Sequence, residues 1–490
     1  MSAAFGLNPI FLEAIVVVLG IFLLMVEAFV PSLKKSVIAY AGIIGLGLVL
    51  GLSFLSSGAF IPQDAAYASY YTGDALAMLF KQFALVTTIL VLVMAVEYSP
   101  VLETGMPGSR PGAGVGEFYT LPILTCAGLM WMASATDFIT IFVSLELVTI
   151  SFYILVAFMR RSKACLEAGT KYLILGALST GFLVYGITWI FGATGQTNLA
   201  RIAEVLPQVA VSGQISLLFG LALVLVALGF KVAAFPFQFW VPDVYQGAPT
   251  PITAFLSVGS KAAGFIVLLR VLEPFFVIPV IQDKIVAAIA ALAGLTLIFG
   301  NLAALPQTNM KRLMAYSSIG HAGYLLMGVA SVGVVMAGPA IVYYLTAYLV
   351  TTCLAFLVLI IAAKAIGKDD IVSFNGLGRR SPYLAGALLI SMLSLAGVPF
   401  TAGFLGKFLI FEAALADGHY ALVVIGAITV ACGFYFYLKV VRAMYWQPVP
   451  ESAGPVPVSM LSKTVLAILT ALVFILGIFP QWVLSRLTIQ

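Results

Sequence analysis

Five charged side chains lie within long apolar stretches of this chain, where an ionisable group can carry a proton. They are Glu146, Lys171, Lys231, Lys261 and Lys407. A lysine at the centre of a membrane-spanning helix costs roughly 2.5–3.5 kcal/mol on insertion scales. Buried lysines give up their proton more readily than exposed ones, and a buried carboxyl near a lysine can be neutral or charged. The set predicts a proton relay inside a membrane protein.

Lys231 precedes a proline that is expected to break its helix. Pro236 has no backbone N–H, so the carbonyl of Val232, four residues earlier, loses its helical partner. An open carbonyl at membrane depth is tolerated only beside protein or water. We therefore expect a hydrated cavity near Lys231. For Lys231, the alternative is a structural kink of the helix. For Glu146, the alternative is a protonated carboxyl that hydrogen-bonds a neighbouring helix.

A related stretch occurs beside Lys407. The sequence Ala-Gly-Val-Pro-Phe, which ends at Phe400, parallels Ala-Ala-Phe-Pro-Phe, which ends at Phe237. Pro236 and Pro399 are thus both predicted helix breaks. The predicted topology makes the two segments cross the membrane in opposite directions, as inverted repeats with broken helices do. Lys407 follows Pro399 by about two helical turns, so it can face the same cavity.

The remaining candidates leave two interpretations open. Lys261 lies near the middle of its predicted span, behind a face of Ser and Thr residues. Lys171 follows Glu167 by four residues, so an ion pair along one helix explains it as well as a relay does. His321 lies beside Tyr324 and two serines. It is either a hydrogen-bonded core histidine or an auxiliary relay group.

The composition is that of a polytopic membrane protein. Of the 490 residues, 62% are hydrophobic and only 9% are charged, which excludes a soluble globular domain. The four cysteines are isolated and form no CxxC pair, so no cysteine-ligated iron–sulfur centre is expected in the chain. No glycine-rich nucleotide motif occurs. We expect no cofactor and no metal in this chain.

Apolar runs of about 20 residues predict an all-α protein with about fourteen transmembrane helices. The first run is long for a signal sequence and is expected to be retained as a span. Approximate limits of the runs are 10–30, 36–57, 76–97, 117–134, 137–159, 165–191, 214–240, 249–272, 285–305, 312–332, 337–363, 383–416, 420–441 and 463–485.

These spans group into two predicted five-helix repeats with flanking helices. Residues 1–110 hold helices 1–3, residues 111–275 the first repeat (helices 4–8), residues 276–445 the second, inverted repeat (helices 9–13), and residues 446–490 the last helix. The broken helices are 7 and 12.

The distribution of basic residues predicts the orientation. With the N-terminus outside, most of the 24 lysines and arginines lie in inner loops or at inner span ends, where the positive-inside rule places them. Four fall on the outer side: Arg201, Arg270, Lys284 and Arg486. An even number of spans then puts both termini on the periplasmic side.

The charged residues lie in stretches that resemble the antiporter-like membrane subunits of proton-pumping NADH:quinone oxidoreductase (respiratory complex I). That family is shared with multisubunit cation/proton antiporters and membrane-bound hydrogenases. The resemblance covers about residues 10–485, and the segment Asp243–Gly247 resembles subunit N more than subunits L and M. The stretches that carry it are Glu117–Tyr119, Leu145–Leu147, Glu167–Tyr172, Phe230–Trp240, Pro242–Phe265, Lys311–Tyr324 and Leu395–Phe408.

The resemblance implies a role for each matching charge. Glu146 and Lys231 would form the charged pair of a first half-channel, Lys261 would connect it to a second, and Lys407 would be the terminal lysine of that second half-channel. Lys171 and His321 match auxiliary positions.

The resemblance also implies partners and a location. The chain would be a translocase subunit without its own redox centre, driven by quinone reduction elsewhere in the complex. NADH, flavin, iron–sulfur clusters and quinone would belong to partner subunits, and the membrane partners would include antiporter-like subunit M and small subunits K and J. The expected location is the bacterial inner (plasma) membrane. The alternatives are a subunit of a sodium/proton antiporter or membrane-bound hydrogenase, and a helical scaffold with vestigial charges.

Overall fold

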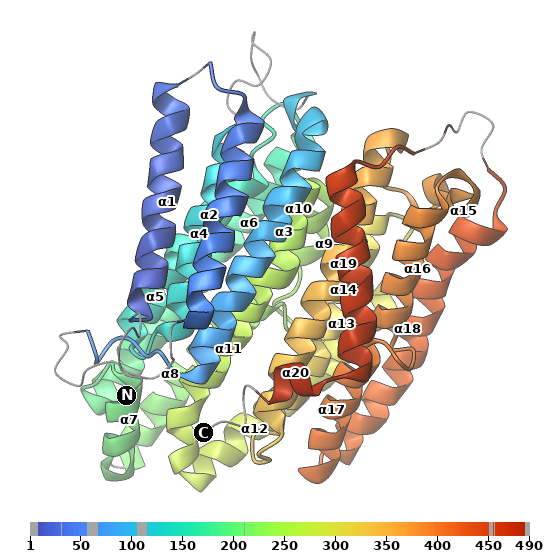
Figure 1. The fold of residues 1–490 in the computed structure, drawn as a ribbon. Helices are drawn as coiled ribbons and strands as arrows, with labels where there is room; N and C mark the ends of the chain where they lie inside the picture. The colour runs from blue at the N-terminus through green and yellow to red at the C-terminus, as the bar shows by residue number, and fades with distance from the viewer. Residues whose placement is uncertain are drawn as a thin grey trace, which may run out of the picture. The chain divides into compact units, whose positions relative to one another are not determined.

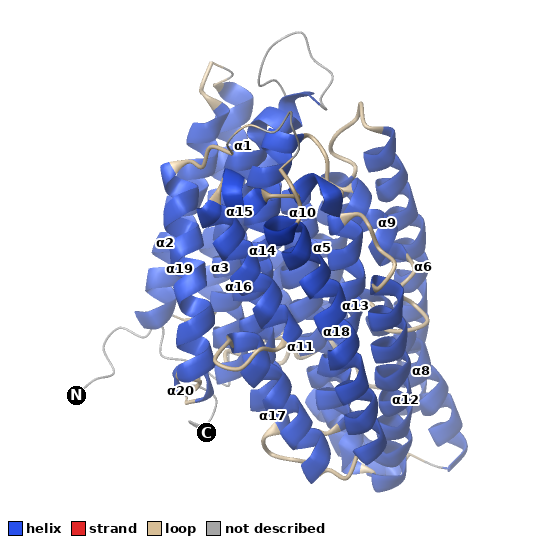
Figure 2. Ribbon diagram, turned by 90° about the vertical axis from the view of Figure 1, so that its right-hand side faces the viewer, coloured by secondary structure: helices blue, strands red, loops and turns tan. Residues whose placement is uncertain are grey.

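The computed structural model describes residues 8–30, 32–55, 67–104, 115–209, 211–449, 454 and 456–485. Nearly all of these residues are helical (Figure 1). Figure 2 shows no strand among them, and the only extended pairings in the described part of the chain are three isolated bridges. Helices satisfy every backbone N–H and C=O within one segment, which apolar surroundings require. The all-α prediction is confirmed.

Eleven helical segments of the described residues are long and apolar enough to cross a membrane. One of them, Thr250–Val277, consists of four consecutive elements: α10 (Thr250–Phe255), η2 (Leu256–Ser260), α11 (Lys261–Leu272) and η3 (Glu273–Val277). The other ten are α1 (Ile10–Phe29), α2 (Lys35–Leu55), α3 (Ala75–Thr104), α5 (Phe138–Val156), α6 (Lys163–Thr194), α8 (Val211–Val232), α12 (Pro279–Ala304), α14 (Ala337–Ile366), α18 (Tyr420–Trp446) and α19 (Met460–Ile478).

Other helices fall in the remaining predicted spans. They are α4 (Glu117–Ser134), α13 (Met310–Ala330) and the pair α16 (Pro382–Ala396) and α17 (Ala402–Ala416). The count of fourteen spans therefore stays a prediction. Short elements connect the long ones: α7 (Leu199–Val205), η1 (Leu206–Gln208), α9 (Trp240–Gly247), η4 (Ile371–Phe374), α15 (Leu377–Arg380) and α20 (Gln481–Leu484).

Polar side chains fix where several helices begin. Asp137, Ser162, Asn198 and Asn309 each accept a hydrogen bond from a backbone N–H in the first turn of α5, α6, α7 and α13. Such caps satisfy N–H groups that have no partner inside the helix. They set the ends of α5 and α6, which carry Glu146 and Lys171.

The first break lies at the end of α8. The helix stops at Val232, Ala233 adopts a left-handed φ of 67°, and helix resumes only at Trp240 in α9. The Phe235–Pro236 peptide bond is cis, and the N–H of Phe235 donates to the hydroxyl of Thr296 at 2.9 Å. The predicted span 214–240 thus ends early, because the chain before Pro236 leaves the helical conformation.

The second break separates α16 from α17 within the predicted run 383–416. α16 ends at Ala396, Gly397 has φ of 93° and Phe400 has φ of 67°, and α17 begins at Ala402. The N–H of Gly397 donates to the carbonyls of Leu393 and Ser394 at 3.0 Å. This is the tight turn by which many helices end at a left-handed glycine.

A third irregularity lies within the predicted span 249–272. The five residues Leu256–Ser260 form a π turn between α10 and α11. π turns are rare in proteins, and those that do occur are often found at functional sites. No proline lies within this turn, so sequence analysis did not predict it, and it ends directly before Lys261.

The chain divides into two compact units. Unit 1 comprises Met1–Val232 and Gly259–Ile285, and unit 2 comprises Ala233–Val258 and Val286–Gln490. In unit 1, α4 packs against α1, α3 and α5, while α6 packs along α8 and α11 contacts α8. In unit 2, α14 is the central helix and contacts α13, α16, α17 and α19. The predicted division into two repeats uses other boundaries and stays a prediction.

Two facing glycines set the separation of α6 and α8. A Cβ atom on Gly186 would lie 2.6 Å from the carbonyl oxygen of Gly220, and one on Gly220 would lie 2.8 Å from that of Gly186. Only glycine allows this contact, which resembles the small-residue interfaces of membrane helices. The hydroxyl of Ser179 adds a hydrogen bond of 3.2 Å to the carbonyl of Ala227, one turn before Lys231.

We expect Gly186→Val to destabilise the packing of α6 on α8, because a side chain has no room between the two backbones. Overpacking of this kind typically costs about 1–3 kcal/mol. Thermal unfolding of the purified protein is the measurement. Gly192→Val is the matched control, since no atom lies within 4 Å of a Cβ at Gly192 on the same helix. Equal stability of the two variants would contradict the close contact.

Candidate functional site

Lys231 is buried in the last turn of α8, directly before the first break. Its ammonium group donates to the hydroxyl of Thr149 on α5 at 2.7 Å. The stem of the side chain packs against Gly264, which lies one turn after Lys261 on α11. The carboxyl end of a helix carries partial negative charge, which favours an ammonium group there. The helix end and the Thr149 hydroxyl together stabilise the buried lysine.

Glu146 lies on the same face of α5 as Thr149, one turn earlier. Its carboxylate accepts a hydrogen bond of 2.7 Å from the hydroxyl of Thr180 on α6. The charge of Glu146 acts on Lys231 electrostatically. Within the described residues, however, the two groups form no direct ion pair. Both groups are instead connected to α5. Lys231 donates to Thr149 on this helix, and Glu146 on the same helix accepts from Thr180 on α6.

Tyr153 extends this face of α5 by one further turn. Its hydroxyl is buried and has no hydrogen-bond partner among the described residues. A buried hydroxyl without a partner costs about 1–3 kcal/mol, which a bound water would offset. Glu146, Thr149 and Tyr153 thus place a carboxylate and two hydroxyls along one side of α5.

Lys171 differs from the other four charges. It forms an ion pair of 2.7 Å with Glu167 on its own helix, with side chains that are 42% and 65% exposed. Exposed pairs at this spacing contribute only about 0.3–0.5 kcal/mol. Of the two interpretations of Lys171, the ion pair along one helix matches the observed geometry.

Lys261 is buried at the first residue of α11, immediately after the π turn. The helix that carries it packs against α8, which carries Lys231. The two lysines therefore come from neighbouring helices of unit 1, and each lies beside an interruption of regular helix.

Lys407 lies on α17 in unit 2 and caps the broken end of α16. Its ammonium group donates to the carbonyls of Leu395 and Ala396 at 2.8 and 2.9 Å. These carbonyls belong to the last turn of α16, where no helical N–H remains for them. The ammonium also lies 5.2 Å from the centre of the Tyr324 ring. Lys407 thus satisfies the carbonyls that the second break exposes.

His321 lies between two tyrosines. Its Nδ1 is 2.7 Å from the hydroxyl of Tyr344 on α14, and its Nε2 is 3.1 Å from the hydroxyl of Tyr437 on α18. The hydroxyl of Tyr437 also hydrogen-bonds Ser317. Hydroxyl groups both donate and accept, so this arrangement suits either neutral tautomer of the imidazole and its protonated form.

A small cavity connects the surroundings of His321 with the second break. Its volume is about 10 Å³, and its lining includes His321, Tyr348, Ser394, Leu395 and Gly403. A cavity of about 10–15 Å³ holds one water molecule if polar partners surround it. Leu395, whose carbonyl binds Lys407, forms part of the wall. One water there would lie between the histidine and the broken turn.

Sequence analysis missed several partners of the predicted residues. Thr149 and Thr180 bind Lys231 and Glu146, while Tyr344 and Tyr437 bind His321. Only Thr149 carried a usable signal, because it follows Glu146 by one helical turn. The others come from distant positions in the chain and are brought together by packing alone.

The sequence and the fold are similar to those of known proteins. The sequence matches the family described as NADH:quinone oxidoreductase/Mrp antiporter, TM, over residues 135–433. The NADH-quinone oxidoreductase subunit N of Trichlorobacter lovleyi is 40% identical over 482 residues, which cover 98% of this chain and 96% of that protein. The chain belongs to the NADH:quinone oxidoreductase/Mrp antiporter family.

Solved structures of this family agree along almost the whole chain. A chain of respiratory complex I from Thermus thermophilus with bound aureothin has a TM-score of 0.79 and 32% identity, covering 97% of this chain and 98% of that one. A chain of the archaeal membrane-bound sulfane sulfur reductase has a TM-score of 0.85 and 25% identity, covering 97% and 95%. The predicted family resemblance is confirmed, and the protein is a polytopic membrane protein.

Two features of the structure favour glycine at position 397. Its φ of 93° is strained for any other residue, and a Cβ atom there would lie 3.2 Å from Cδ of Lys407. We expect Gly397→Ala to destabilise the protein more than Gly367→Ala. Both residues have positive φ, where an alanine costs about 1–2 kcal/mol, but nothing lies within 4 Å of a Cβ at Gly367.

Thermal unfolding of the two alanine variants measures the difference. A larger loss for Gly397→Ala is the expected result, because only that variant also displaces Lys407. An equal loss would show that the lysine adapts freely and that its position depends little on the broken turn.

Proposed function

We propose that this chain is the proton-translocating subunit N of an NADH:quinone oxidoreductase. The observation that carries the proposal is the burial of three lysines beside three interruptions of helix, at Val232, at Leu256–Ser260 and at Ala396. Charges that cost this much to bury are kept in membranes mainly where ions or protons pass. The relatives named subunit N support the same role.

The first half-channel comprises Glu146 and Lys231 in unit 1. The charge of Glu146 acts electrostatically on Lys231. Thr149 accepts from the ammonium, and Thr180 donates to the carboxylate. When Lys231 loses its proton, the Thr149 hydroxyl can turn and donate to the amine instead. Lys261 receives the proton next, and Lys171 acts as an auxiliary group near Glu167.

The second half-channel comprises His321 and Lys407 in unit 2. The cavity beside His321 has room for about one water molecule, which would link the histidine to the broken turn after α16. Lys407 receives the proton there. The carbonyls of Leu395 and Ala396 stabilise the ammonium form. Loss of the proton frees Lys407 to leave these carbonyls. Proton release and a change in the turn between α16 and α17 are therefore linked, and Pro399 prevents this turn from closing into regular helix.

The energy comes from quinone reduction in other subunits of the complex. NADH, flavin, iron–sulfur clusters and quinone bind there, and the membrane partners of this chain are antiporter-like subunit M and small subunits K and J. The bundle lies in the bacterial inner membrane with both termini on the periplasmic side. Its two halves are the repeats 111–275 and 276–445, flanked by helices in 1–110 and 446–490.

A sodium/proton antiporter subunit is the second candidate, because the family description names Mrp antiporters beside the oxidoreductase. The subunits that copurify with this chain in the assembled complex distinguish the two functions. We expect NADH- or ferredoxin-oxidising and iron–sulfur subunits to copurify. Copurification of small antiporter subunits without a redox partner would replace the first proposal by the second.

Lys231→Met should leave the complex assembled but lower proton translocation per quinone reduced. A methionine has similar length, yet it can neither carry a proton nor bond Thr149. Vesicles that hold the assembled variant complex provide both rates. The matched control is Lys463→Met, an exposed lysine in the first turn of α19. Full translocation by an assembled Lys231→Met complex would remove this residue from the pathway.

Single cysteines at positions 2 and 490 test the orientation. In a variant without the four native cysteines, Ser2→Cys and Gln490→Cys should both react with a membrane-impermeant thiol reagent added to intact cells without an outer membrane. The positive-inside distribution of lysine and arginine is the physical reason. Labelling of these cysteines only after the membrane has been permeabilised would refute the proposed orientation.

A further inference from the structure

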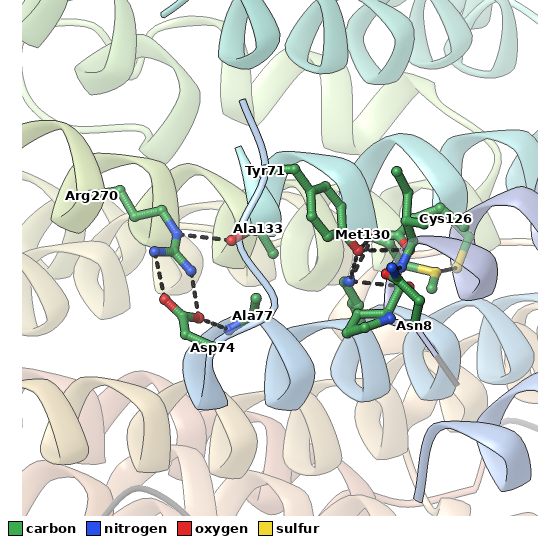
Figure 3. A network of polar contacts seen from close by, with 12 residues as sticks. Asn8, Tyr71, Asp74, Ala77, Cys126, Met130, Ala133 and Arg270 are labelled. Carbon is green, nitrogen blue, oxygen red and sulfur yellow. Dashed lines mark hydrogen bonds and ion pairs between the residues drawn. The ribbon is translucent and has the colours of Figure 1, made fainter. Parts of the chain in front are cut away.

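A second group of buried charges lies in unit 1, away from the five residues discussed above. Glu13 on α1 and Lys81 on α3 are both fully buried and form an ion pair of 2.9 Å. Tyr71, in the segment before α3, donates from its hydroxyl to both carboxylate oxygens of Glu13 at 3.1 and 3.2 Å. Lys81 in turn donates to the hydroxyl oxygen of Tyr71. Figure 3 shows these contacts around the labelled Tyr71.

The surrounding backbone fixes Tyr71 at this point. The N–H of Thr72 donates to the carbonyl of Ser134 at 2.7 Å, and that of Thr136 donates to the carbonyl of Tyr70 at 3.2 Å. Burial raises the pKa of Tyr71 above its ordinary value, so the hydroxyl keeps its proton. Tyr71 therefore accepts from Lys81 and donates to Glu13 at the same time. The three groups form a continuous path along which a proton can move.

A second charged pair lies beside this group and reaches the surface. Arg270 on α11 binds both carboxylate oxygens of Asp74 at 2.8 and 2.9 Å, and its Nε donates to the carbonyl of Ala133 (Figure 3). The side chain of Asp74 is 32% exposed. Asp74 directly precedes α3, where its carboxylate accepts from the N–H of Ala77, and its charge acts on Lys81 seven residues later. Asp74 thus places a carboxylate at the surface above the buried lysine.

A further hydroxyl lies beside the Tyr71 phenol. Ser134 is fully buried. Burial raises the pKa of the Tyr71 phenol, and the Oγ of Ser134 lowers it by a smaller amount, because it acts on the phenol as a hydrogen-bonding neighbour. The site therefore contains a second hydroxyl close to the proton path.

Stability alone does not account for this arrangement. A buried ion pair gains little over an apolar pair of the same size, because both charges lose their hydration. Ionisable residues within membrane helices are rare, pair with one another and mark ion and proton pathways. The Tyr71 hydroxyl also bonds both Glu13 and Lys81 beside their direct ion pair, and an ion pair for stability does not need this third group.

We propose that Glu13, Tyr71 and Lys81 form a further proton-exchange site of this chain, open to the surface near Asp74. A proton leaves Nζ of Lys81 for the oxygen of Tyr71, while the Tyr71 proton passes to Glu13. The product is a neutral amine, an unchanged phenol and a carboxylic acid. The amine then takes up a proton from water, and the carboxylic acid releases one. Each cycle moves one proton through the site without a co-reactant.

This inference rests on the proposed function for its physiological role, so the experiment includes variants that separate the two. The main variant is Glu13→Gln with Lys81→Met, which removes both charges together and leaves no buried ion unpaired. In the assembled complex we expect translocation per quinone reduced to fall to about half or less, as for loss of a relay group. Glu27→Gln with Lys35→Met is the matched control, because it removes an ion pair of 3.3 Å between α1 and α2 that the proposed site does not use. Full translocation is expected of this control.

Three results decide the matter. Full translocation by the assembled double variant overturns the site, provided that Lys231→Met lowers translocation in the same assay. If Lys231→Met also translocates at the full rate, the result contradicts the proposed function as well as this inference. If the double variant does not assemble, Tyr71→Phe replaces it. This variant loses one oxygen and keeps the ion pair, so lowered translocation supports the site and full translocation overturns it.

Infrared difference spectroscopy supplies a readout that a purely structural role would not change. During quinone turnover, the purified complex should show a band of a protonated carboxyl that is absent from the Glu13→Gln variant. Identical spectra of the two proteins would show that Glu13 never takes up a proton, and would overturn the proposal.

Discussion

The structure depends on how broken helices satisfy their carbonyl groups inside an apolar bundle. A carbonyl at the end of a helix needs a donor, and neither lipid nor apolar side chains provide one. Lys407 supplies that donor to Leu395 and Ala396. Lys231 differs, because it lies in the last turn of its own helix, at the negative end of α8, and donates to the hydroxyl of Thr149. The break therefore explains why a lysine is stable at each position.

The contacts of the buried charges differ in a way that matters for proton movement. Glu146 and Lys231 each bind a different threonine hydroxyl, whereas Glu13 and Lys81 form a direct pair that a tyrosine hydroxyl also contacts. A hydroxyl can reverse the direction of its hydrogen bond when a neighbour gains or loses a proton. A hydroxyl partner thus allows the charge of its neighbour to change without leaving a polar group unpaired in the interior. The imidazole of His321, between two phenols, follows the same principle.

Sequence reasoning succeeded where a single residue type dictates local structure. Pro236 and Pro399 marked chain segments that do leave the helical conformation, and the apolar runs marked the long helices. It missed the π turn before Lys261, because no proline or charge marks it. It also overlooked Glu13, although a carboxyl in the first apolar run was visible. The partners Tyr344 and Tyr437 had no local signal, since only tertiary packing brings them to His321.

The central claim is that helix breaks hold lysines together with water, and a high-resolution map of the assembled complex tests it most directly. We predict an ordered water in the cavity beside His321 and Ser394, within hydrogen-bond distance of the broken turn that binds Lys407. We also predict non-helical backbone from Gly397 to Phe400. A continuous helix through this segment, with Lys407 turned toward lipid and the cavity dry, would contradict the account.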